Sequence, residues 1–513
     1  MRSWTNPDIR SFRGEHYLHF IVLAAILVAV LCAYSNVFHG ELQFDDEVFI
    51  NESLGHLGLA SFFSSTTILN ALHGNRMLTL YSFAANYHFG GLSVTGYHIV
   101  NIVIHVCTTL LVFYFTKLLF VLAPRSEFPE RTTVLFSLCV TAFFALHPLQ
   151  TESVSYIVQR SELLASFWYL ACLISLLRFT VTVRRSAFAW WCAGATFFIA
   201  GWSSKEIIIT VPLVYLLCII YTGGTKYLAK AWKGLVPYCV TGSVLIGIKL
   251  VTLNGSTDAG FSSFTPGVGV YVMTQLKVIA IYLLMVLAPR NQNIDHDVRS
   301  VTTLLSLEGA LLVIAWMCVL FVCFYLLAFY KGVYAGHIRG MAFGLLWIIV
   351  ILLPTSSVIP VRDVMFEHRM YLPLLGAGIV LVLFVNLMML SLFPGGVESV
   401  LWALLLLVSV SLGYATFQRN MVWQSKLSLW ADSAKKSPNK SRPHNNMGNC
   451  YLLSENYRAA IVAYRTAIRL DPSNIEAYYN LSLALRSLGQ VEEALKVHRM
   501  FVDRVGQKTP DNK

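Results

Sequence analysis

The feature that most restricts how this chain can fold is a succession of long apolar segments. Such segments recur from residue 17 to about residue 417, and about 20 consecutive apolar residues are enough for a helix to cross a bilayer. Hydrophobic residues make up 56% of the chain and charged residues only 13%, a balance that excludes an ordinary soluble globule. We therefore predict an all-α, polytopic membrane helical bundle over residues 1–417, with about eleven crossings, and a polar domain over residues 418–513.

Basic residues indicate how the chain is oriented in the membrane. Arg2, Arg10 and Arg13 precede the first apolar segment and place the N-terminus in the cytoplasm. Alternation of the helices brings four later basic loops to the same side, and these contain Arg125 with Arg131, Arg184 with Arg185, Lys226 with Lys230 and Lys233, and Lys331 with Arg339. The net charge of +11 therefore follows from topology, and no nucleic-acid partner is predicted.

The same orientation assigns the outer parts of the chain. Residues 39–96 become the first extracytoplasmic loop, and the polar C-terminal domain also lies outside. The apolar stretch 271–289 would begin and end outside. We therefore predict that this stretch is re-entrant or packed within the bundle and does not cross fully.

The cysteines do not indicate a disulfide framework. Nine of the ten lie inside apolar segments, where cysteine behaves as a small apolar side chain. Their spacing matches no metal-binding pattern. No cofactor is predicted from this composition.

The polar domain repeats with a period of 34 residues. Ala460 and Ala494 are one period apart, as are Trp430 and Tyr464, and the small and aromatic positions fit the tetratricopeptide pattern. We predict a half repeat at 421–440 followed by two repeats. Such helix pairs bury their faces against neighbours, so this short array is expected to dock on the membrane domain. Its expected role is contact with a protein or peptide, and a structural lid is the alternative.

Two adjacent carboxylates, Asp45 and Asp46, follow the first apolar segment. Charged groups next to a bilayer are costly and usually have a cation partner, a metal or a catalytic role. A carboxylate pair just outside the membrane could deprotonate a hydroxyl group and hold a charged donor. We therefore predict that this pair is functional.

Histidines and an asparagine lie at the outer end of the second helix. His98, Asn101 and His105 are spaced i, i+3 and i+7, so they share one helix face. They could support a substrate, or they could form hydrogen bonds between helices of the bundle. A divalent metal site is a further alternative.

Four further parts of the sequence bring charged and polar residues to the same predicted face. His147 ends the third helix, and Glu152 and Arg160 follow it. Arg160 could bind a phosphate through its planar guanidinium, or it could pair with Glu152 or Glu162. Lys205 with Glu206 forms the second part, and an ion pair between helices is its alternative role. The other two are the run Glu367, His368, Arg369 and Tyr371, and Arg76 in the first loop.

Carboxylates, cations and histidines around one outer cavity suit transfer from an anionic, lipid-linked donor. The cations would hold the phosphate and stabilise it as it leaves. A carboxylate would take the proton from the acceptor hydroxyl. The bilayer would supply the donor laterally.

The order of these motifs resembles the transmembrane and tetratricopeptide-repeat O-mannosyltransferases and their bacterial relatives, in the C-type glycosyltransferase superfamily. The match extends over nearly the whole chain. It rests on Phe44-Asp45-Asp46 with Ile50 and Asn51, His98-x-x-Asn101-x-x-x-His105, His147-Pro148-x-x-Thr151-Glu152 with Arg160, Ser204-Lys205-Glu206, Glu367-His368-Arg369-x-Tyr371-Leu372-Pro373, and Arg419-Asn420-x-x-Trp423. The chain departs from the family in its short repeat array and in Asn75-Arg76-Met77-Leu78, where a proline is expected after the arginine.

The resemblance implies an inverting transfer of a sugar, expected to be mannose, from a polyprenyl-phosphate carrier to a Ser or Thr hydroxyl of a protein. It implies that the acidic motif is catalytic, with Asp45 as the base and Asp46 orienting a cation or the acceptor, and the reverse assignment stays open. The candidates for the donor phosphate are Arg160, Lys205, Arg369 and Arg76. Candidates for substrate binding or support are His98, Asn101, His105, His147, Glu152, Glu206, Glu367, His368 and Tyr371.

Other functions stay open at this point. A non-enzymatic membrane scaffold would explain the repeats but not the polar cluster, and a transporter would need charges near the middle of the membrane. A lipid or glycan could replace protein as the acceptor. The expected location is a bacterial inner membrane with periplasmic repeats, or the endoplasmic reticulum membrane in a eukaryote.

Overall fold

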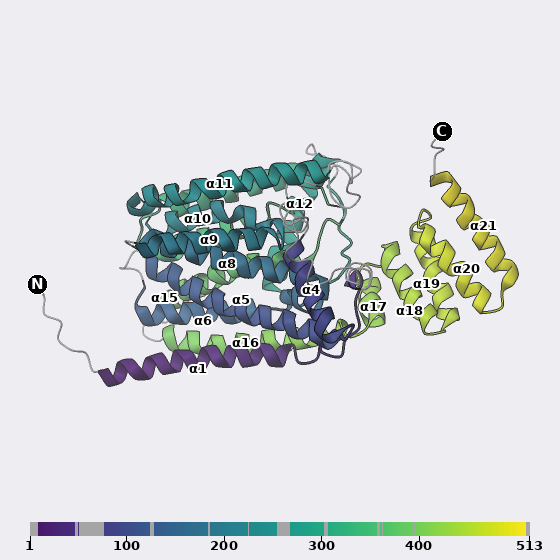
Figure 1. Ribbon diagram of the computed structural model, residues 1–513, viewed down its shortest axis with the longest axis horizontal. Helices are drawn as coiled ribbons and strands as arrows, with labels where there is room; N and C mark the ends of the chain where they lie inside the picture. The colour runs from purple at the N-terminus through teal and green to yellow at the C-terminus, as the bar shows by residue number, and fades with distance from the viewer. Residues whose placement is uncertain are drawn as a thin grey trace, which may run out of the picture.

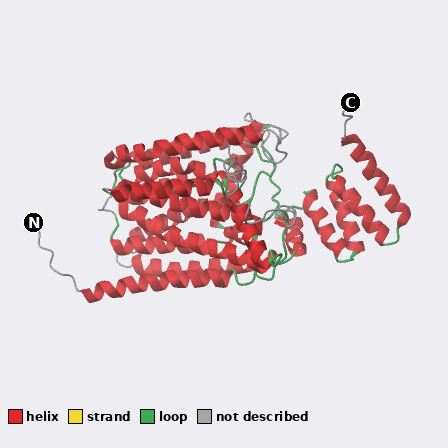
Figure 2. Cartoon of the chain, in the orientation of Figure 1, coloured by secondary structure: helices red, strands yellow, loops and turns green. Residues whose placement is uncertain are grey.

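The computed structural model describes residues 9–46, 50, 76–123, 128–182, 185–223, 225–253, 267–301, 306–356, 360–361, 363–392 and 397–508. Over these residues the chain is helical and has no β-strand (Figure 2). The predicted all-α class is therefore confirmed for the described part of the chain. Arg2 and most of the first outer loop, including Asn51 and Asn75, lie outside the described residues.

Long apolar helices run side by side and form one bundle (Figure 1). Consecutive helices often pack as neighbours, and the first packs along the last. The bundle consists of α1 (Ile9–Ala33), α5 (Val94–Leu122), α6 (Glu130–Leu146), α8 (Arg160–Val181), α9 (Arg185–Trp202), α10 (Val211–Tyr221), α11 (Thr225–Leu253), α12 (Val268–Leu287), α13 (Leu307–Phe329), α14 (Ala335–Leu352), α15 (Pro373–Leu392) and α16 (Val397–Val422). Shorter helices at one end are α4 (Met77–Gly90), η2 (Pro148–Gln150), α7 (Thr151–Ser155), η3 (Ile157–Gln159), η4 (Glu206–Thr210) and η5 (Glu367–Met370).

The helix lengths make this chain an integral membrane protein. Among the described residues, 8 helices are long and apolar enough to cross a membrane. A ninth crossing results if Glu130–Leu146 and Pro148–Ser155, which are bent by 52°, form one span. The sequence-based number of crossings is higher because it includes α9 and the two shorter apolar helices Leu18–Ala33 and Glu206–Tyr221, although it leaves out α12.

The segment predicted to be re-entrant is one continuous helix. α12 has 20 residues, which corresponds to about 30 Å of helix, and it is long and apolar enough to cross a membrane. Half of the residues in its most apolar stretch are buried inside the protein. The structure therefore agrees with packing in the bundle but not with a re-entrant hairpin.

Two glycines allow α14 and α15 to approach closely. A Cβ atom on Gly376 would lie 2.5 Å from the carbonyl oxygen of Gly344 and 2.7 Å from Cδ1 of Trp347. A Cβ on Gly344 would lie 2.5 Å from the carbonyl oxygen of Gly376. Small residues at such contacts let helix backbones pack in membranes, where packing is a main source of association.

We expect Gly376→Ala to destabilise the bundle by about 1–3 kcal/mol, because the new methyl group forces two backbones apart. Thermal unfolding of the detergent-solubilised protein would measure this as a lower midpoint. Gly269→Ala in α12 is the matched control, because nothing lies within 4 Å of its Cβ position. Equal midpoints for the two variants would contradict the close contact.

The repeat domain follows α16 and consists of stacked helices. α17 (Lys426–Lys436) precedes two helix pairs, α18 (Ser441–Leu453) with α19 (Tyr457–Leu470), and α20 (Ile475–Ser487) with α21 (Val491–Lys508). This confirms the predicted half repeat and two repeats. Ala460, Tyr464 and Leu485 are among the fully buried residues of its core.

The repeat domain and the start of α1 lie at opposite ends of the bundle (Figure 1). α17 and the start of α18 contact the bundle through polar bonds. Asn293 and Asp295, in the loop after α12, bond to Ser437 at 2.8 Å and 2.7 Å. The Lys436 ammonium donates to the carbonyl oxygen of Gln292 at 2.7 Å. The expected docking of the repeats on the membrane domain is thus present.

Candidate functional site

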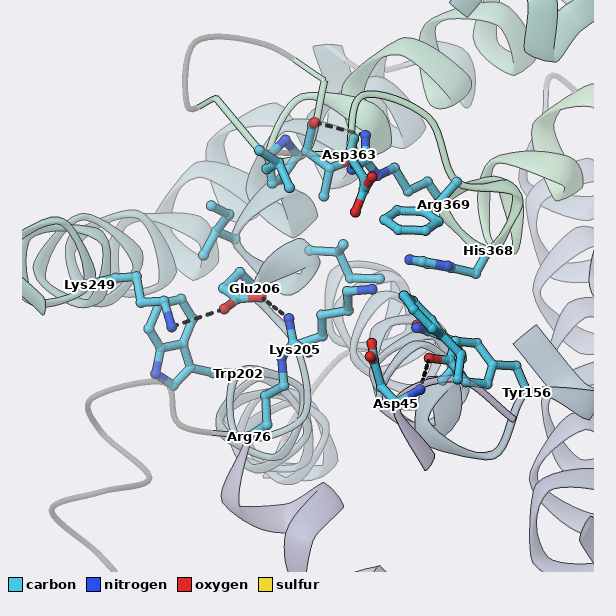
Figure 3. A pocket seen from close by; sticks show the side chains of 18 of the residues that line it. Asp45, Arg76, Tyr156, Trp202, Lys205, Glu206, Lys249, Asp363, His368 and Arg369 are labelled. Atoms are coloured by element: carbon cyan, nitrogen blue, oxygen red, sulfur yellow. Dashed lines mark hydrogen bonds and ion pairs between the residues drawn. The ribbon is translucent and has the colours of Figure 1, made fainter. Parts of the chain in front are cut away.

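A cavity of about 590 Å³ lies at the end of the bundle that faces the repeat domain. It combines charged groups from many elements with an apolar part (Figure 3). Its lining residues are Phe44, Asp45, Arg76, Tyr156, Gln159, Trp202, Lys205, Glu206, Ile207, Ile209, Ile246, Lys249, Pro354, Thr355, Val361, Asp363, Phe366, His368, Arg369 and Arg442.

The two adjacent carboxylates have different surroundings. Asp45 lines the cavity, and its backbone N–H donates to the Tyr156 hydroxyl at 3.1 Å. Figure 3 shows the side chains of Asp45 and Lys205 extending toward the same part of the cavity. Asp46 is only 1% exposed and does not line the cavity. Geometry therefore separates the pair into one exposed and one buried group.

Asp46 holds two segments of backbone together. Its Oδ2 accepts from the Gln43 N–H at 3.0 Å, and its Oδ1 accepts from the Val158 N–H at 2.8 Å. Burial raises the pKa of Asp46 to about 7, with a smaller contribution from the charge of Asp45. Asp46 therefore fixes the turn that carries Asp45.

The raised pKa of Asp46 predicts a pH-dependent stability. The folded protein binds this proton more tightly than the unfolded chain. Protonated Asp46 therefore adds to the free energy of unfolding in acid, and this contribution is lost as pH rises through about 7. Between the unfolded and folded pKa values of Asp46, the free energy of unfolding is expected to fall by about 1.4 kcal/mol per pH unit. Thermal unfolding from acid to neutral pH would measure it. Asp46→Asn should flatten this slope and lower stability throughout, because its amide cannot accept both N–H groups. A slope that Asp46→Asn leaves intact would contradict the assignment.

Arg369 is a cation of the cavity that has no carboxylate partner within 4 Å among the described residues. Its guanidinium donates to the carbonyl oxygens of Asp363 at 2.8 Å and Val364 at 3.0 Å. It also lies over the Phe366 ring, 5.5 Å from the ring centre. Nη1 also lies 3.5 Å from the Thr355 carbonyl oxygen, and the guanidinium bonds to the Tyr271 hydroxyl. Because these partners are uncharged, the positive charge of Arg369 can still attract an anion.

The other predicted cations of the cavity are held by carboxylates. Lys205 is 2.5 Å from Glu162. Glu206 is 3.1 Å from Lys249 and 3.9 Å from Arg76. Arg76 and Lys205 thus both line the cavity, and Lys205 also forms an ion pair between helices, the structural alternative stated for its segment. Glu206 holds Lys249 and Arg76 near each other, while Glu162 holds Lys205.

A buried network stands behind His368. The Nδ1–H of His368 donates to Glu152 at 2.6 Å, and the backbone N–H of Glu367 donates to the other Glu152 oxygen at 2.8 Å. Burial and the nearby cations Lys205 and Arg369 hold the pKa of His368 well below its usual range, so the ring is neutral. Glu152 does not line the cavity, and its role is to orient the imidazole that does.

Glu367 also points away from the cavity. It accepts from His296 at 3.0 Å and from Gln292 at 2.9 Å. Burial alone would raise its pKa, but the bonds from His296 and the charges of His296 and Arg419 lower it below the usual value. Glu367 therefore stays ionised and joins η5 to the loop after α12.

Arg160 requires a correction. It is completely buried and is absent from the cavity. Its guanidinium donates to Asn101 Oδ1 at 2.7 Å, to the Ser82 carbonyl at 3.0 Å and to the Tyr97 carbonyl at 3.1 Å, and it stacks over Phe83. Neither Glu152 nor Glu162 forms an ion pair with it. Arg160 and Asn101 connect α4, α5 and α8, so we no longer assign Arg160 to the donor phosphate.

The histidines of the bundle also support structure. Nε2–H of His105 donates to the Ala145 carbonyl at 3.0 Å, so Nδ1 accepts from the Tyr371 hydroxyl at 2.8 Å. His147 donates to the Val286 carbonyl at 3.1 Å and accepts from the Leu149 N–H. His98 is buried, 3% exposed, and away from the cavity. The substrate roles predicted for these four residues do not match their positions.

The expected alternative of a metal at His98, Asn101 and His105 does not fit either. Both ring nitrogens of His105 are bonded to protein groups, and Asn101 holds Arg160. In the described part of the chain, no three His, Cys, Asp or Glu side chains are grouped so that they could hold a metal ion.

Sequence reasoning assigned no site role to several polar residues of the cavity, among them Tyr156, Lys249, Asp363 and Arg442. Tyr156 lies between Glu152 and Arg160, so its position in a singled-out segment was a usable signal. Lys249 lies near the end of α11, a helix that the sequence indicated only as a membrane crossing. Arg442 belongs to α18 of the repeat domain, and no local pattern connects it with the membrane domain.

Known proteins similar to this chain support the resemblance found in the motifs. A TPR repeat family model matches residues 448–489. The chain is 24% identical over 473 residues to human protein O-mannosyl-transferase TMTC3, which covers 85% of this chain and 49% of the human protein. It is 23% identical over 552 residues to Drosophila melanogaster protein O-mannosyl-transferase Tmtc3, with 91% of this chain and 57% of the fly protein covered.

A third relative is Caenorhabditis elegans protein O-mannosyl-transferase F38B6.6, 26% identical over 494 residues, with 91% of this chain and 65% of the worm protein covered. The chain thus spans 49% to 65% of the length of these three relatives. No solved structure matches the chain.

Proposed function

We propose that this chain is an integral membrane glycosyltransferase that moves a sugar, mannose, from a polyprenyl-phosphate carrier to a Ser or Thr hydroxyl of a protein. The observation that carries the proposal is the position of Asp45. Its carboxylate lines a cavity that also contains the cations Arg76, Lys205, Lys249 and Arg369. The similarity to proteins named protein O-mannosyl-transferases supports the same reaction class.

The reaction is a direct displacement with inversion. The acceptor hydroxyl oxygen attacks the anomeric carbon on the face opposite the phosphate. The new carbon–oxygen bond forms as the bond to the phosphate oxygen breaks, and the electron pair leaves with polyprenyl phosphate. Asp45 accepts the hydroxyl proton, which makes the oxygen a better nucleophile.

The cations stabilise the leaving phosphate. Arg369 suits this role, because it lines the cavity and no carboxylate among the described residues lies within 4 Å to balance its charge. Positive groups that face a developing anionic charge are often the largest contribution to catalysis. The remaining cations Arg76, Lys205 and Lys249 add positive potential, which their carboxylate partners partly offset.

An apolar part of the cavity suits the lipid portion of the donor. Trp202, Ile207, Ile209 and Ile246 line it, and they belong to or border helices of the bundle. A carrier lipid could therefore keep its chain among apolar side chains while its phosphate reaches the cations.

Transfer of radiolabelled mannose from polyprenyl-phosphate-mannose to protein, in membranes that contain the full chain, tests the proposal. Label in protein that is released by β-elimination, as expected for O-linked sugar, supports it. Label that appears only in lipid or glycan would show that the acceptor is a lipid or a glycan and not a protein. Absence of transfer with mannose and with other polyprenyl-phosphate sugars would return the repeat domain to the role of a scaffold.

A further inference from the structure

The membrane domain does not build the cavity alone. Arg442, at the start of α18, is one of the lining residues, whereas all other described lining residues belong to the membrane domain. The repeat domain therefore lines the same cavity as Asp45. A repeat domain that only bound an acceptor protein would not need to reach this cavity.

Arg442 joins two loops of the membrane domain. Its Nε and Nη2 donate to the two carboxylate oxygens of Asp295 at 2.8 Å and 2.7 Å, which is a bidentate pair. The guanidinium also bonds to Asp363, with Nη1 at 3.2 Å from Oδ2. Asp295 is only 4% exposed, and Lys440 binds it as well. Paired bonds of this kind fix both distance and orientation.

Arg442 also contacts the acidic turn. Its guanidinium carbon lies 5.9 Å from the centre of the Phe44 ring, and Phe44 directly precedes Asp45. The Phe44 ring packs edge-on against Trp430 of α17 at 5.5 Å. On its other side it meets Tyr156 at 6.4 Å, and the hydroxyl of Tyr156 accepts from the Asp45 N–H. Two helices of the repeat domain thus clamp the residue beside Asp45.

This turn needs external support because Phe44 is strained. Its φ is +45°, in the left-handed region that non-glycine residues rarely adopt, and such positions persist only when their surroundings hold them. The Glu41 N–H donates to the Gln424 carbonyl and the Gln43 side-chain amide donates to the Trp423 carbonyl, both at 3.0 Å, and these bonds connect the same segment to the junction of α16 and α17.

We propose that Arg442 is a positioning residue that holds the Phe44–Asp45 turn, so that the repeat domain is part of the catalytic assembly. This inference rests on the proposed transfer reaction for its kinetic consequence. A displacement of about 1 Å in a reacting group can lower a rate about 100-fold. Loss of Arg442 should therefore lower kcat more than it raises the KM for the donor.

The kinetic test uses the full-length protein. Arg442→Gln is expected to lower kcat about 10- to 100-fold, with a smaller change in donor KM. Arg442→Lys keeps the charge but loses the bidentate fork, and should recover only part of the rate. Arg465→Gln is the control, because Arg465 pairs with Glu493 on the exposed surface of the repeat domain. A raised donor KM with kcat intact would overturn the proposal and make Arg442 a ligand of the phosphate.

A second measurement does not depend on transfer. In Asp45→Cys protein, a membrane-impermeant maleimide reports how accessible the turn is, after the labelling of the native cysteines has been subtracted. We expect faster labelling when Arg442→Gln is added and an unchanged rate with Arg465→Gln. Equal labelling rates together with unchanged kcat would overturn the proposal. Faster labelling, together with no sugar transfer by the protein that keeps Asp45, would support positioning while rejecting the proposed function.

Discussion

Asp45→Asn is expected to lower sugar transfer about 100- to 10,000-fold, the usual contribution of a positioned general base. The amide is nearly isosteric with the carboxylate but cannot accept the hydroxyl proton. Because Asp45 is exposed in the cavity and the nearly isosteric amide needs no repacking, the variant should fold normally. Initial rates with purified protein in nanodiscs would measure the loss.

Two comparisons keep this result interpretable. Asp503→Asn, on the exposed surface of α21, should leave the rate unchanged. Asp46→Asn should instead lower the unfolding midpoint, because the two backbone bonds of Asp46 are disturbed. If Asp45→Asn kept its rate while Asp46→Asn lost activity without losing stability, the two roles would have to be exchanged.

Arg369→Gln is expected to lower kcat about 100- to 1,000-fold, the range found when one donor facing a developing negative charge is removed. Arg369 is 6% exposed and lines the cavity without a described carboxylate partner within 4 Å. The loss should grow with the basicity of the leaving phosphate, because a poorer leaving group depends more on the cation. Measuring kcat of both proteins with two donors whose leaving phosphates differ in basicity would test this dependence.

A structural role of Arg369 can be separated from this catalytic one. Arg369→Lys retains a positive charge but loses the fork that bonds to the carbonyl oxygens of Asp363 and Val364. We expect it to recover a large part of kcat despite a lower unfolding midpoint. Equal losses of kcat in both variants, in proportion to lost stability, would show that Arg369 only supports its loop. A charge-removing control far from the cavity is Arg465→Gln.

Arg160 was predicted to bind phosphate but is buried away from the cavity. This shows that a sequence pattern can identify the right region without identifying the residue that lines the site. Arg160 lies close in sequence to Tyr156, but Tyr156 faces the cavity whereas Arg160 lies beneath it, bonded to Asn101. A buried charge is tolerated only when its donors are satisfied. The carbonyl groups and the asparagine that satisfy Arg160 come from α4 and α5, which no local motif reveals.

Local sequence patterns were enough to predict the helical membrane bundle, the repeats and the end of the bundle at which the polar residues gather. These properties depend on local quantities: the length of apolar segments, a 34-residue period and the positions of charges beside the spans. The sequence did not reveal that Asp45 faces the cavity while Asp46 is buried, or that Arg442 of the repeat domain lines the same cavity, because these positions depend on tertiary contacts. Adjacent residues can point in opposite directions, and the direction is set by partners such as Val158 and Asp295, which folding brings together from distant parts of the chain.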